Sequence, residues 1–513
     1  MSNIVKEPTI DERSITHSDS DLNISQDKNQ LSQTESLYPR QTLLKKLDFT
    51  ILPTLSLIFF VFSLDRANLS QVLTDNFLED LQITQNVTNA AVAILWGAIC
   101  IGDIPSNIIL SKIGAKYWIP LQVILWGIVS TFQAFIKTRQ QFLATRFLLG
   151  LCESGFIPNS MAFLASYTTR EEYGKRVVLY FYGNGFAGMF GPLIASGILK
   201  MRGYHDWPGW RWLWLIEGIF TIFIGLISFL LLPKSIDESS TVMFGELLNN
   251  DETECFIAQL KLQDRAINNS DQTSSRSKSI TFGDVKETLK DWRIYPHFLM
   301  ALTGLPAFQP TTTYGSLILK QLGFSTINSN LLAIPWGAGG LITTLVLVTI
   351  SDKFKDRSLP MLIGSIWSWI LAIIIKTKSQ VYKRWSFYAL YTIYQIAPSW
   401  HNINAAWIAE NQITSQRRSV VLALYFMSAN AAAIPGAQIF RANDSPNYPK
   451  GWIAILVLFV CLNVIIVLQR FQYVWSNKRK ARKLKQLNEL GELEYLDLII
   501  PGDTSDLTFK HPL

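Results

Sequence analysis

The sequence is poor in charge and in cysteine. Only 17% of its 513 residues are charged, whereas 49% are hydrophobic and the mean hydropathy is +0.20. The four cysteines show no paired spacing: Cys100, Cys152, Cys255 and Cys461. A disulfide framework and a metal site are therefore not implied.

Sequence motifs of enzymes are also missing. The chain has no nucleotide-cradling P-loop, no pair of histidines in the His-Glu-x-x-His pattern and no Cys/His cluster with metal-ligand spacing. We therefore expect a protein that is not an enzyme and that needs no cofactor. If it is a transporter, the lack of an ATP-binding segment makes transport secondary or passive.

The apolar residues are concentrated in runs of about 20 residues, the length at which a helix crosses about 30 Å of hydrocarbon. Six runs precede a polar stretch, at 48–67, 88–110, 117–137, 141–166, 175–199 and 210–233. Six follow it, at 293–319, 327–350, 359–377, 384–410, 417–441 and 452–474. We predict an all-α polytopic membrane protein with twelve transmembrane helices in two pseudo-symmetric six-helix bundles.

The domain limits follow from these runs. Residues 1–41 are rich in Ser, Thr, Asn, Gln and Asp and offer little apolar surface to bury, so we expect a disordered tail at 1–45 without a cleaved signal. The remaining predicted domains are a six-helix bundle at 46–233, a central loop at 234–291, a second bundle at 292–475 and a basic tail at 476–513.

Basic residues beside the runs indicate the orientation. They lie before the first run and after runs 2, 4, 8 and 10: Lys45, Lys46, Lys112, Lys116, Arg170, Lys175, Arg176, Lys353, Lys355, Arg357, Arg417 and Arg418. The loop at 70–87 has no Lys or Arg, although four basic residues between runs 9 and 10 count against a clean rule. We expect both termini and the central loop in the cytoplasm and the protein in the plasma membrane.

The net charge of +7 arises partly from six basic residues between 478 and 485, directly after the last apolar run. That placement suits the anionic cytoplasmic face of a membrane better than nucleic acid.

Several ionisable residues lie inside the apolar runs, where each costs at least about 2.5–3.5 kcal/mol near the centre of the bilayer. They are Asp65, Arg66, Asp103, Arg146, Glu153, Glu217, His401 and Glu410. Arg146 and Glu153 are seven residues apart, which places them on one helix face about 10 Å apart along the axis. They either share a cavity or are each neutralised by a neighbouring helix that they help to lock in place.

Uncharged polar residues also lie near the middle of the predicted helices. They are Gln309, Thr311, Thr312, Thr313, Tyr314, Asn402, Asn404 and Asn430. Together they fit a polar substrate cavity, and individually each is as compatible with hydrogen bonding between helices. In the fifth run, Gly183, Ala187, Gly191 and Ala195 form a ridge of small residues that allows either rocking of two helices or static close packing.

Four motifs resemble those of the major facilitator superfamily and, within it, of the fungal anion:cation symporters, the allantoate permease group. They are Leu64-Asp-Arg-Ala-Asn68, Arg146-Phe-Leu-Leu-Gly-Leu-Cys-Glu153 continuing to Pro158, Gly209-Trp-Arg-Trp212 with Glu217-Gly218, and Asn443-Asp-Ser-Pro-Asn-Tyr448. The resemblance covers about residues 40–475 and implies the major facilitator fold. Within the group, it is nearest to transporters of sulfonates and related sulfur anions.

The same motifs resemble those of the animal vesicular glutamate transporters and sialin. That resemblance implies that Arg66 and Arg146 contact an anionic substrate and that Glu153 takes part in proton coupling. Those glutamate transporters have an arginine in helix 7, whereas the stretch 306–314 here has none. A monovalent anion is therefore expected rather than a dicarboxylate.

The resulting hypothesis is proton-coupled uptake of a small organic or sulfur-containing anion by a monomer in the lipid bilayer. A nutrient sensor of similar fold and an anion efflux exchanger remain alternatives. The predicted substrate-binding residues are Arg66, Arg146, Gln309, Tyr314, Asn404 and Asn430, and the predicted proton-coupling residue is Glu153.

Overall fold

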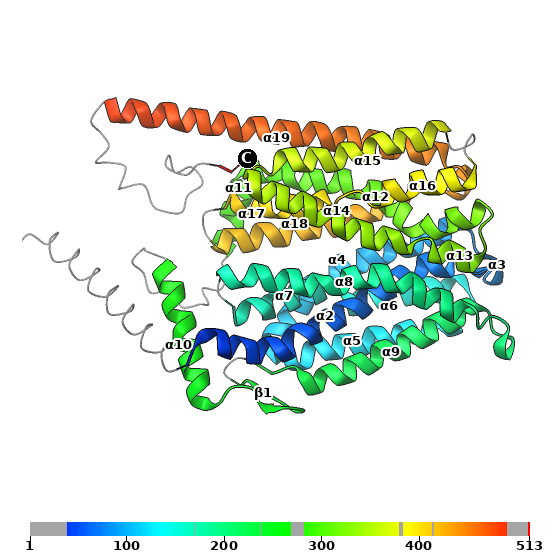
Figure 1. Ribbon diagram of the computed structural model, residues 1–513, viewed down its shortest axis with the longest axis horizontal. Coiled ribbons are helices and arrows are strands. Elements are labelled where there is room, and N and C mark those ends of the chain that lie inside the picture. The colour runs from blue at the N-terminus through cyan, green and yellow to red at the C-terminus, as the bar shows by residue number, and fades with distance from the viewer. Residues whose placement is uncertain are drawn as a thin grey trace, which may run out of the picture.

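The chain folds into two bundles of long helices that lie side by side (Figure 1). The computed structural model describes residues 38–168, 170–235, 238–267, 282–378, 383–412, 415–489 and 511–512. The prediction of an all-helical polytopic membrane fold in two halves is confirmed, with one two-stranded hairpin, β1 (Ser240–Thr241) and β2 (Gly245–Glu246), between the bundles in sequence.

The N half contains α2 (Arg40–Val72), α3 (Phe77–Asp80), α4 (Gln85–Ile113), α5 (Ala115–Phe132), η1 (Gln133–Phe135), α6 (Arg139–Glu153), α7 (Phe156–Ser166), α8 (Arg170–Leu199), η2 (Tyr204–Asp206) and α9 (Gly209–Leu231). Its core is aromatic: Phe59 of α2 stacks on Tyr180 of α8, and Phe62 meets Trp126 of α5 edge to face. These contacts hold α2 at the centre of the half.

The segment between the bundles adds α10 (Asn250–Ile267) and α11 (Phe282–Lys290) to the hairpin. The C half contains η3 (Trp292–Ile294), α12 (Tyr295–Gln321), α13 (Thr326–Leu331), α14 (Ile334–Phe354), α15 (Ser358–Lys378), α16 (Arg384–Gln395), α17 (Trp400–Glu410), α18 (Ser415–Gly436), η4 (Ala442–Asp444) and α19 (Pro449–Glu489).

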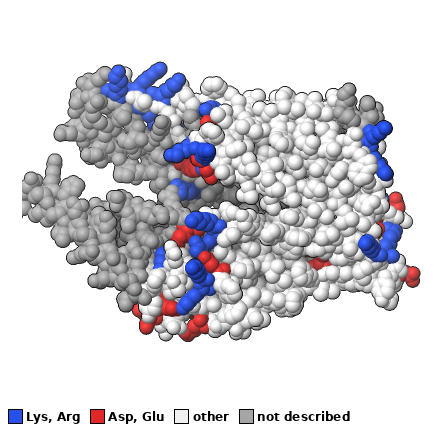
Figure 2. Space-filling model, viewed as in Figure 1, with Lys and Arg blue, Asp and Glu red and all other residues white. Residues whose placement is uncertain are grey.

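Ten helical segments of the described chain are long and apolar enough to cross a membrane. They correspond to ten of the twelve predicted runs. The other two runs, 293–319 and 384–410, form α12 and the pair α16 and α17. Figure 2 shows the matching surface, a broad band with few charged side chains between two ends where Lys, Arg, Asp and Glu gather.

Two helices extend past the predicted domain limits. α2 begins at Arg40, whose side chain forms an ion pair with Glu172 of α8 at 2.8 Å and lies over the ring of Phe256. α19 continues to Glu489, beyond the limit at 475. The rest of the predicted N-terminal tail, residues 1–37, lies outside the described residues.

The small residues of α8 face two neighbours. A side chain on Gly183 would meet the backbone of α2, with the amide nitrogen of Phe60 at 3.1 Å, and one on Gly191 would meet Leu64 of α2 at 3.0 Å. Gly188 instead faces α14 of the other half, where a Cβ added to Gly337 would lie 2.5 Å from the Gly188 carbonyl. The predicted ridge therefore packs inside the N half, and a neighbouring glycine contacts the C half.

Candidate functional site

The fourth membrane-crossing segment of the N half is broken, and the break positions its charged residues. α6 ends at Glu153 and α7 begins at Phe156, so the predicted helix 141–166 is two helices. Gly155 adopts a φ of +72°, the left-handed region that favours glycine, and its N–H donates to Asp103 of α4 at 2.7 Å. Gln122 of α5 donates to the carbonyl of Ser154 at 2.7 Å. Side chains thus replace the hydrogen bonds that a continuous helix would make.

Glu153 forms an ion pair with Arg66 of α2 at this break. The Arg66 Nε lies 2.9 Å from Oε2 of Glu153, whose side chain is fully buried. The guanidinium also lies over two rings, with the centroid of Phe62 at 4.0 Å and that of Trp96 at 4.7 Å. The second carboxylate oxygen, Oε1, is buried and has no hydrogen-bond partner within the described chain. The pair is therefore only partly satisfied by protein groups.

Arg146 lies two turns before Glu153 on the same face of α6 and forms no ion pair with a carboxylate among the described residues. The residue is 3% exposed, and its Nε and Nη2 have no hydrogen-bond partner within the same part of the chain. The guanidinium instead lies 5.4 Å from the ring centroid of Phe142 and 5.6 Å from that of Trp214. A buried guanidinium supplies only donors, so these nitrogens are available to an anion.

Two further carboxyl groups, those of Asp65 and Glu217, are buried in the N half. Asp65 of α2 accepts hydrogen bonds from Ser130 of α5 and Thr221 of α9, each at 3.1 Å. Glu217 of α9 is buried beside Asn68 of α2. Asp65, Asp103, Glu153 and Glu217 thus place four carboxyl groups among α2, α4, α6 and α9.

Asn430 of α18 extends the site to the C half. Its amide donates to Asp103 at 3.3 Å, while the other Asp103 oxygen binds Gly155. Gln309 of α12 donates to Thr313 of the same helix at 3.2 Å and packs against Gly436 of α18. The structure thus brings Arg66, Glu153 and Asp103 together at the break and connects Asn430 to them.

Tyr314 lies elsewhere, at the end of the bundle that carries α3 and α13, here called the α3 end (Figure 1). Its hydroxyl binds Asn89 of α4 and the carbonyl of Gln85 at 3.4 Å. Further hydrogen bonds join the halves at this end: Asn89 with the Phe440 carbonyl, Gln85 with Tyr448, Asn86 with the Ala442 amide, Thr74 with Thr326 and Asn330, and Lys320 with Asn76. Tyr314 therefore helps to close the α3 end.

The opposite end, which carries α10 and α11, is here called the α10 end (Figure 1). None of the ion pairs described near this end joins the N half to the C half: Asp48 pairs with Arg176 within the N half, and Glu287 of α11 pairs with Arg417 of α18. Figure 2 shows a recess between the halves there, with Lys and Arg around its mouth. The halves are thus hydrogen-bonded at the α3 end and separated at the α10 end.

Asn404 belongs to a hydrogen-bonded cluster inside the C half. Its carbonyl lies 2.6 Å from Nδ1 of His297, and its amide donates to the His297 carbonyl and to the hydroxyl of Tyr425, each at 3.2 Å. The Tyr425 hydroxyl also lies 2.7 Å from Nδ1 of His401. Asn404 is therefore fully engaged within its own bundle, away from Arg66 and Glu153 in sequence and contacts.

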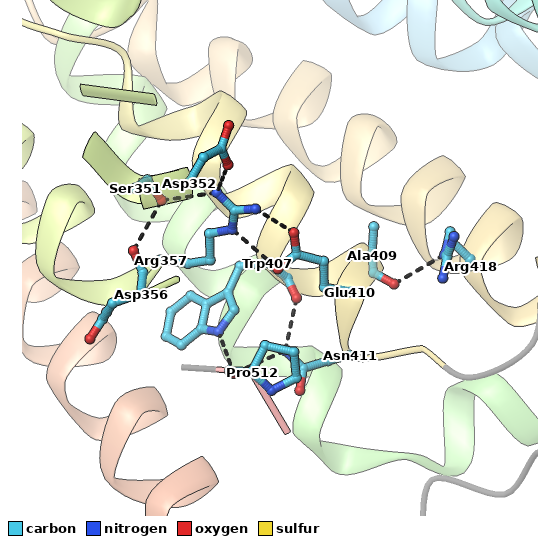
Figure 3. A network of polar contacts seen from close by, with 10 residues as sticks. All are labelled: Ser351, Asp352, Asp356, Arg357, Trp407, Ala409, Glu410, Asn411, Arg418 and Pro512. Atoms are coloured by element: carbon cyan, nitrogen blue, oxygen red, sulfur yellow. Dashed lines mark hydrogen bonds and ion pairs between the residues drawn. The ribbon is translucent and has the colours of Figure 1, made fainter. Parts of the chain in front are cut away.

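Glu410 lies at the α10 end of the C half, where α17 ends (Figure 3). Arg357, in the turn between α14 and α15, pairs with both of its carboxylate oxygens, at 2.5 and 3.1 Å, and with Asp352. The side chain of Glu410 is 37% exposed. Glu410 therefore forms an ion-pair bridge between the end of α17 and the turn that joins α14 to α15.

Comparison with known proteins identifies the family. A model described as Major Facilitator Superfamily matches residues 55–437, from α2 to the end of α18. The chain belongs to the major facilitator superfamily. It is therefore a multi-pass membrane transporter and not an enzyme, as the sequence predicted.

Relatives of this transporter include an uncharacterized transporter of Saccharomyces cerevisiae, YIL166C, which is 32% identical over 89% of this chain and 84% of its own length. The major facilitator-type transporter hxnP of Emericella nidulans is 25% identical over 87% of this chain and 88% of its own. The xylose transporter XylE of E. coli shares the fold, with a TM-score of 0.62 and 15% identity over 83% of this chain and 97% of that one.

Several residues of the site were not found by sequence reasoning. Trp96 stacks on Arg66, and Ser130 and Thr221 bind Asp65. A tryptophan or a single hydroxyl in an apolar run carries no distinguishing signal, because the same residue types pack helices throughout such proteins. Gly155 and Pro158, two residues that favour helix ends, were the only features of this run in the sequence that could have indicated the break.

Proposed function

We propose that this transporter carries a small monovalent organic or sulfur-containing anion together with a proton. The observation that supports the proposal best is Arg146, a buried guanidinium with two nitrogens that have no hydrogen-bond partner within the described residues. An unpaired charge at membrane depth is costly, and a carboxylate or sulfonate offers two oxygens in the geometry that a guanidinium fork recognises.

The neighbouring ion pair supports coupling to a proton. Arg66 already forms an ion pair with Glu153, so an anion that binds Arg66 must compete with the Glu153 carboxylate. Protonation of Glu153 removes that competition. An anion that binds beside the Glu153 carboxylate without a proton would place two like charges close together in a buried site, which is unfavourable.

Energetics support the same coupling. Moving one negative charge inward against about 100 mV costs about 2.3 kcal/mol, whereas an anion moving with one proton carries no net charge. A pH difference of about two units then supplies about 2.7 kcal/mol, enough for roughly hundredfold accumulation.

The C half supports the choice of a monovalent anion. Its α12 offers Gln309 and no arginine between Pro306 and Tyr314, and α18 offers Asn430. Neutral groups of this kind hold the remainder of a substrate without a second fixed positive charge. Membership in the anion:cation symporter group and a preference for sulfur anions are part of this proposal.

We further propose that the α10 end faces the cytoplasm in the plasma membrane, with both termini on that side. Basic side chains near this end, including Lys353 and Arg417, favour that orientation. The recess in Figure 2 would then open toward the cytoplasm.

The test uses purified protein in liposomes with labelled monovalent carboxylates and sulfonates. Glu153→Gln imitates the protonated carboxyl, so it should still exchange labelled for unlabelled anion and should lose accumulation driven by an acidic exterior. Glu217→Gln, which alters a buried carboxyl with no arginine partner in the described chain, should keep that accumulation.

Wild-type accumulation by Glu153→Gln would move the proton site to Asp65 or Glu217. The same panel tests the substrate class, since transport of neutral analogues at equal rates would contradict an anion carrier.

A further inference from the structure

Residues 511–512 lie in a pocket of the C half at the α10 end. His511 is 2% exposed, and its neighbours come from η3, α17 and α19. Figure 3 shows Pro512 beside Trp407 and Asn411, next to the bridge between Arg357 and Glu410. Residues far apart in sequence thus form one enclosed site.

Asn477 of α19 binds both the backbone N–H and the backbone carbonyl of His511. Its Oδ1 accepts the His511 N–H at 2.9 Å, and its Nδ2 donates to the His511 carbonyl at 2.9 Å. Trp407 Nε1 donates to the Pro512 carbonyl at 3.1 Å. Proline has no N–H, so these contacts satisfy all the backbone groups of the two residues.

The ring of His511 is held in one protonation state. Arg293 Nη1 lies 3.0 Å from Nε2, and a guanidinium can only donate, so Nε2 must be the unprotonated nitrogen. Nδ1 then carries the hydrogen and donates to Oδ1 of Asn411 at 2.8 Å. The ring stacks on Tyr473 with centroids 5.0 Å apart. A protonated ring would place an N–H against the N–H of Arg293.

The charges around the ring favour the same state. Burial and the positive charges of Lys480 and Arg293 lower the pKa of His511 to about 3. The titratable groups on the surrounding elements are Asp291 and Arg293 at η3, Glu410 on α17, and Tyr473 and Lys480 on α19. Because the docked pKa is below that of a free histidine, docking is strongest above about pH 6.5 and weakens as the pH falls.

We propose that this pocket is a binding site for the chain's own C-terminal tail, and that it selects a neutral histidine followed by proline. The docked tail is a removable cross-link between η3 at the start of α12, the end of α17 and the middle of α19. Its release leaves Arg293, Asn411 and Asn477 without the ligand that joins them.

A peptide assay tests the site directly. A fluorescent peptide with the sequence of residues 506–513 is titrated into full-length protein and into protein that ends at residue 510. We expect binding to the shortened protein at about pH 7.5 and at least tenfold weaker binding to the full chain, whose pocket is occupied. The His511→Ala peptide should bind at least tenfold more weakly than the native peptide.

The pH dependence gives a second arm. At about pH 5.5, a free histidine of pKa about 6.5 is mostly protonated, so the native peptide should bind about tenfold more weakly than at pH 7.5. The Ala peptide should show no such change. Equal affinity of the two peptides, or equal binding to the full and shortened proteins, would overturn the proposal.

Hydrogen exchange of the full-length protein covers the case in which the shortened protein does not fold. The C-terminal fragment should exchange at least tenfold faster in Asn477→Ala than in wild type, because the His511 amide loses its acceptor. Gln486→Ala, which removes an exposed amide further along α19, is the matched control and should leave exchange unchanged. Identical exchange in wild type and Asn477→Ala would contradict docking.

Discussion

The fourth membrane-crossing segment is broken in both halves, and the two breaks are completed by different chemistry. Between α6 and α7, the break holds Glu153, which pairs with Arg66, and the carboxylate of Asp103 binds the Gly155 amide. Between α16 and α17, hydroxyl groups complete the backbone: Thr343 donates to the Ile396 carbonyl at 2.6 Å, and Thr344 accepts the Ser399 N–H at 2.9 Å.

The difference indicates that the α6–α7 break and the α16–α17 break, although they occupy equivalent positions in the two halves, have different roles. Irregular backbone at membrane depth occurs where it lines a cavity or is satisfied by neighbouring protein groups. The C half satisfies its break with neutral groups, whereas the N half uses the charged groups of Asp103, Glu153 and Arg66. Under the proposed function, these charged groups exchange partners when a proton or an anion binds. Substitutions in the N half and in the C half test whether transport depends on the charged groups alone.

The largest effect is expected for Arg146→Met. Removing the unpartnered guanidinium should lower kcat/KM for uptake at least about 100-fold, about 2.7 kcal/mol, because the anion loses its buried donor. Thermal stability should stay equal or rise, since an unpaired buried charge is removed. Uptake in liposomes and thermal unfolding measure the two quantities.

The matched control in the C half is Tyr388→Phe, seven residues before the end of α16 as Arg146 is before the end of α6. It loses one hydrogen bond to the Leu332 carbonyl and should change kcat/KM less than about twofold. Near-normal uptake by Arg146→Met would contradict the inference that charged groups of the N half, rather than neutral groups of the C half, bind the anion.

An intermediate effect is expected for Arg66→Lys. Lysine keeps the charge but lacks the planar fork that contacts Glu153 and stacks on Phe62 and Trp96. We expect the KM for the anion to rise at least about tenfold, about 1.4 kcal/mol, while expression stays normal. If well-expressed Arg66→Ala transports at the wild-type rate, the arginine has a structural role alone.

The smallest effect on transport is expected for Asn404→Ala in the C half. Its three contacts to His297 and Tyr425 are internal, so their loss should lower the free energy of unfolding by about 1–3 kcal/mol and change KM less than about twofold. Thermal unfolding and uptake kinetics separate these results. A KM raised tenfold with unchanged stability would restore Asn404 as a substrate-binding residue, as the sequence suggested.

The sequence was informative where a single property repeats along the chain. Apolar runs of membrane-spanning length predicted the helices of both halves, and the motifs around Arg66, Arg146 and Glu153 indicated the family. Two of the isolated charges in those runs, Arg66 and Glu153, lie at the break between α6 and α7, where each has a specific environment.

Partnerships between distant residues could not be predicted in the same way. Sequence spacing linked Glu153 with Arg146 on one helix, whereas the structure pairs Glu153 with Arg66 from another helix. Nothing in a polar tail indicates that His511 will meet Asn477, since the contact depends on where three helix ends lie in space. Helix continuity was also overestimated at Gly155, where the left-handed backbone ends α6.

The contact between Gly188 of α8 and Gly337 of α14 bears on how fast the two halves can move past each other. Two backbones meet there without side chains, so relative movement at this point requires no change of rotamer and no interlocked groups to separate. Motion along such a seam meets little internal friction. At this glycine contact, we therefore expect the proposed conformational cycle to be limited by the exchange of partners among buried charges more than by the repacking of side chains.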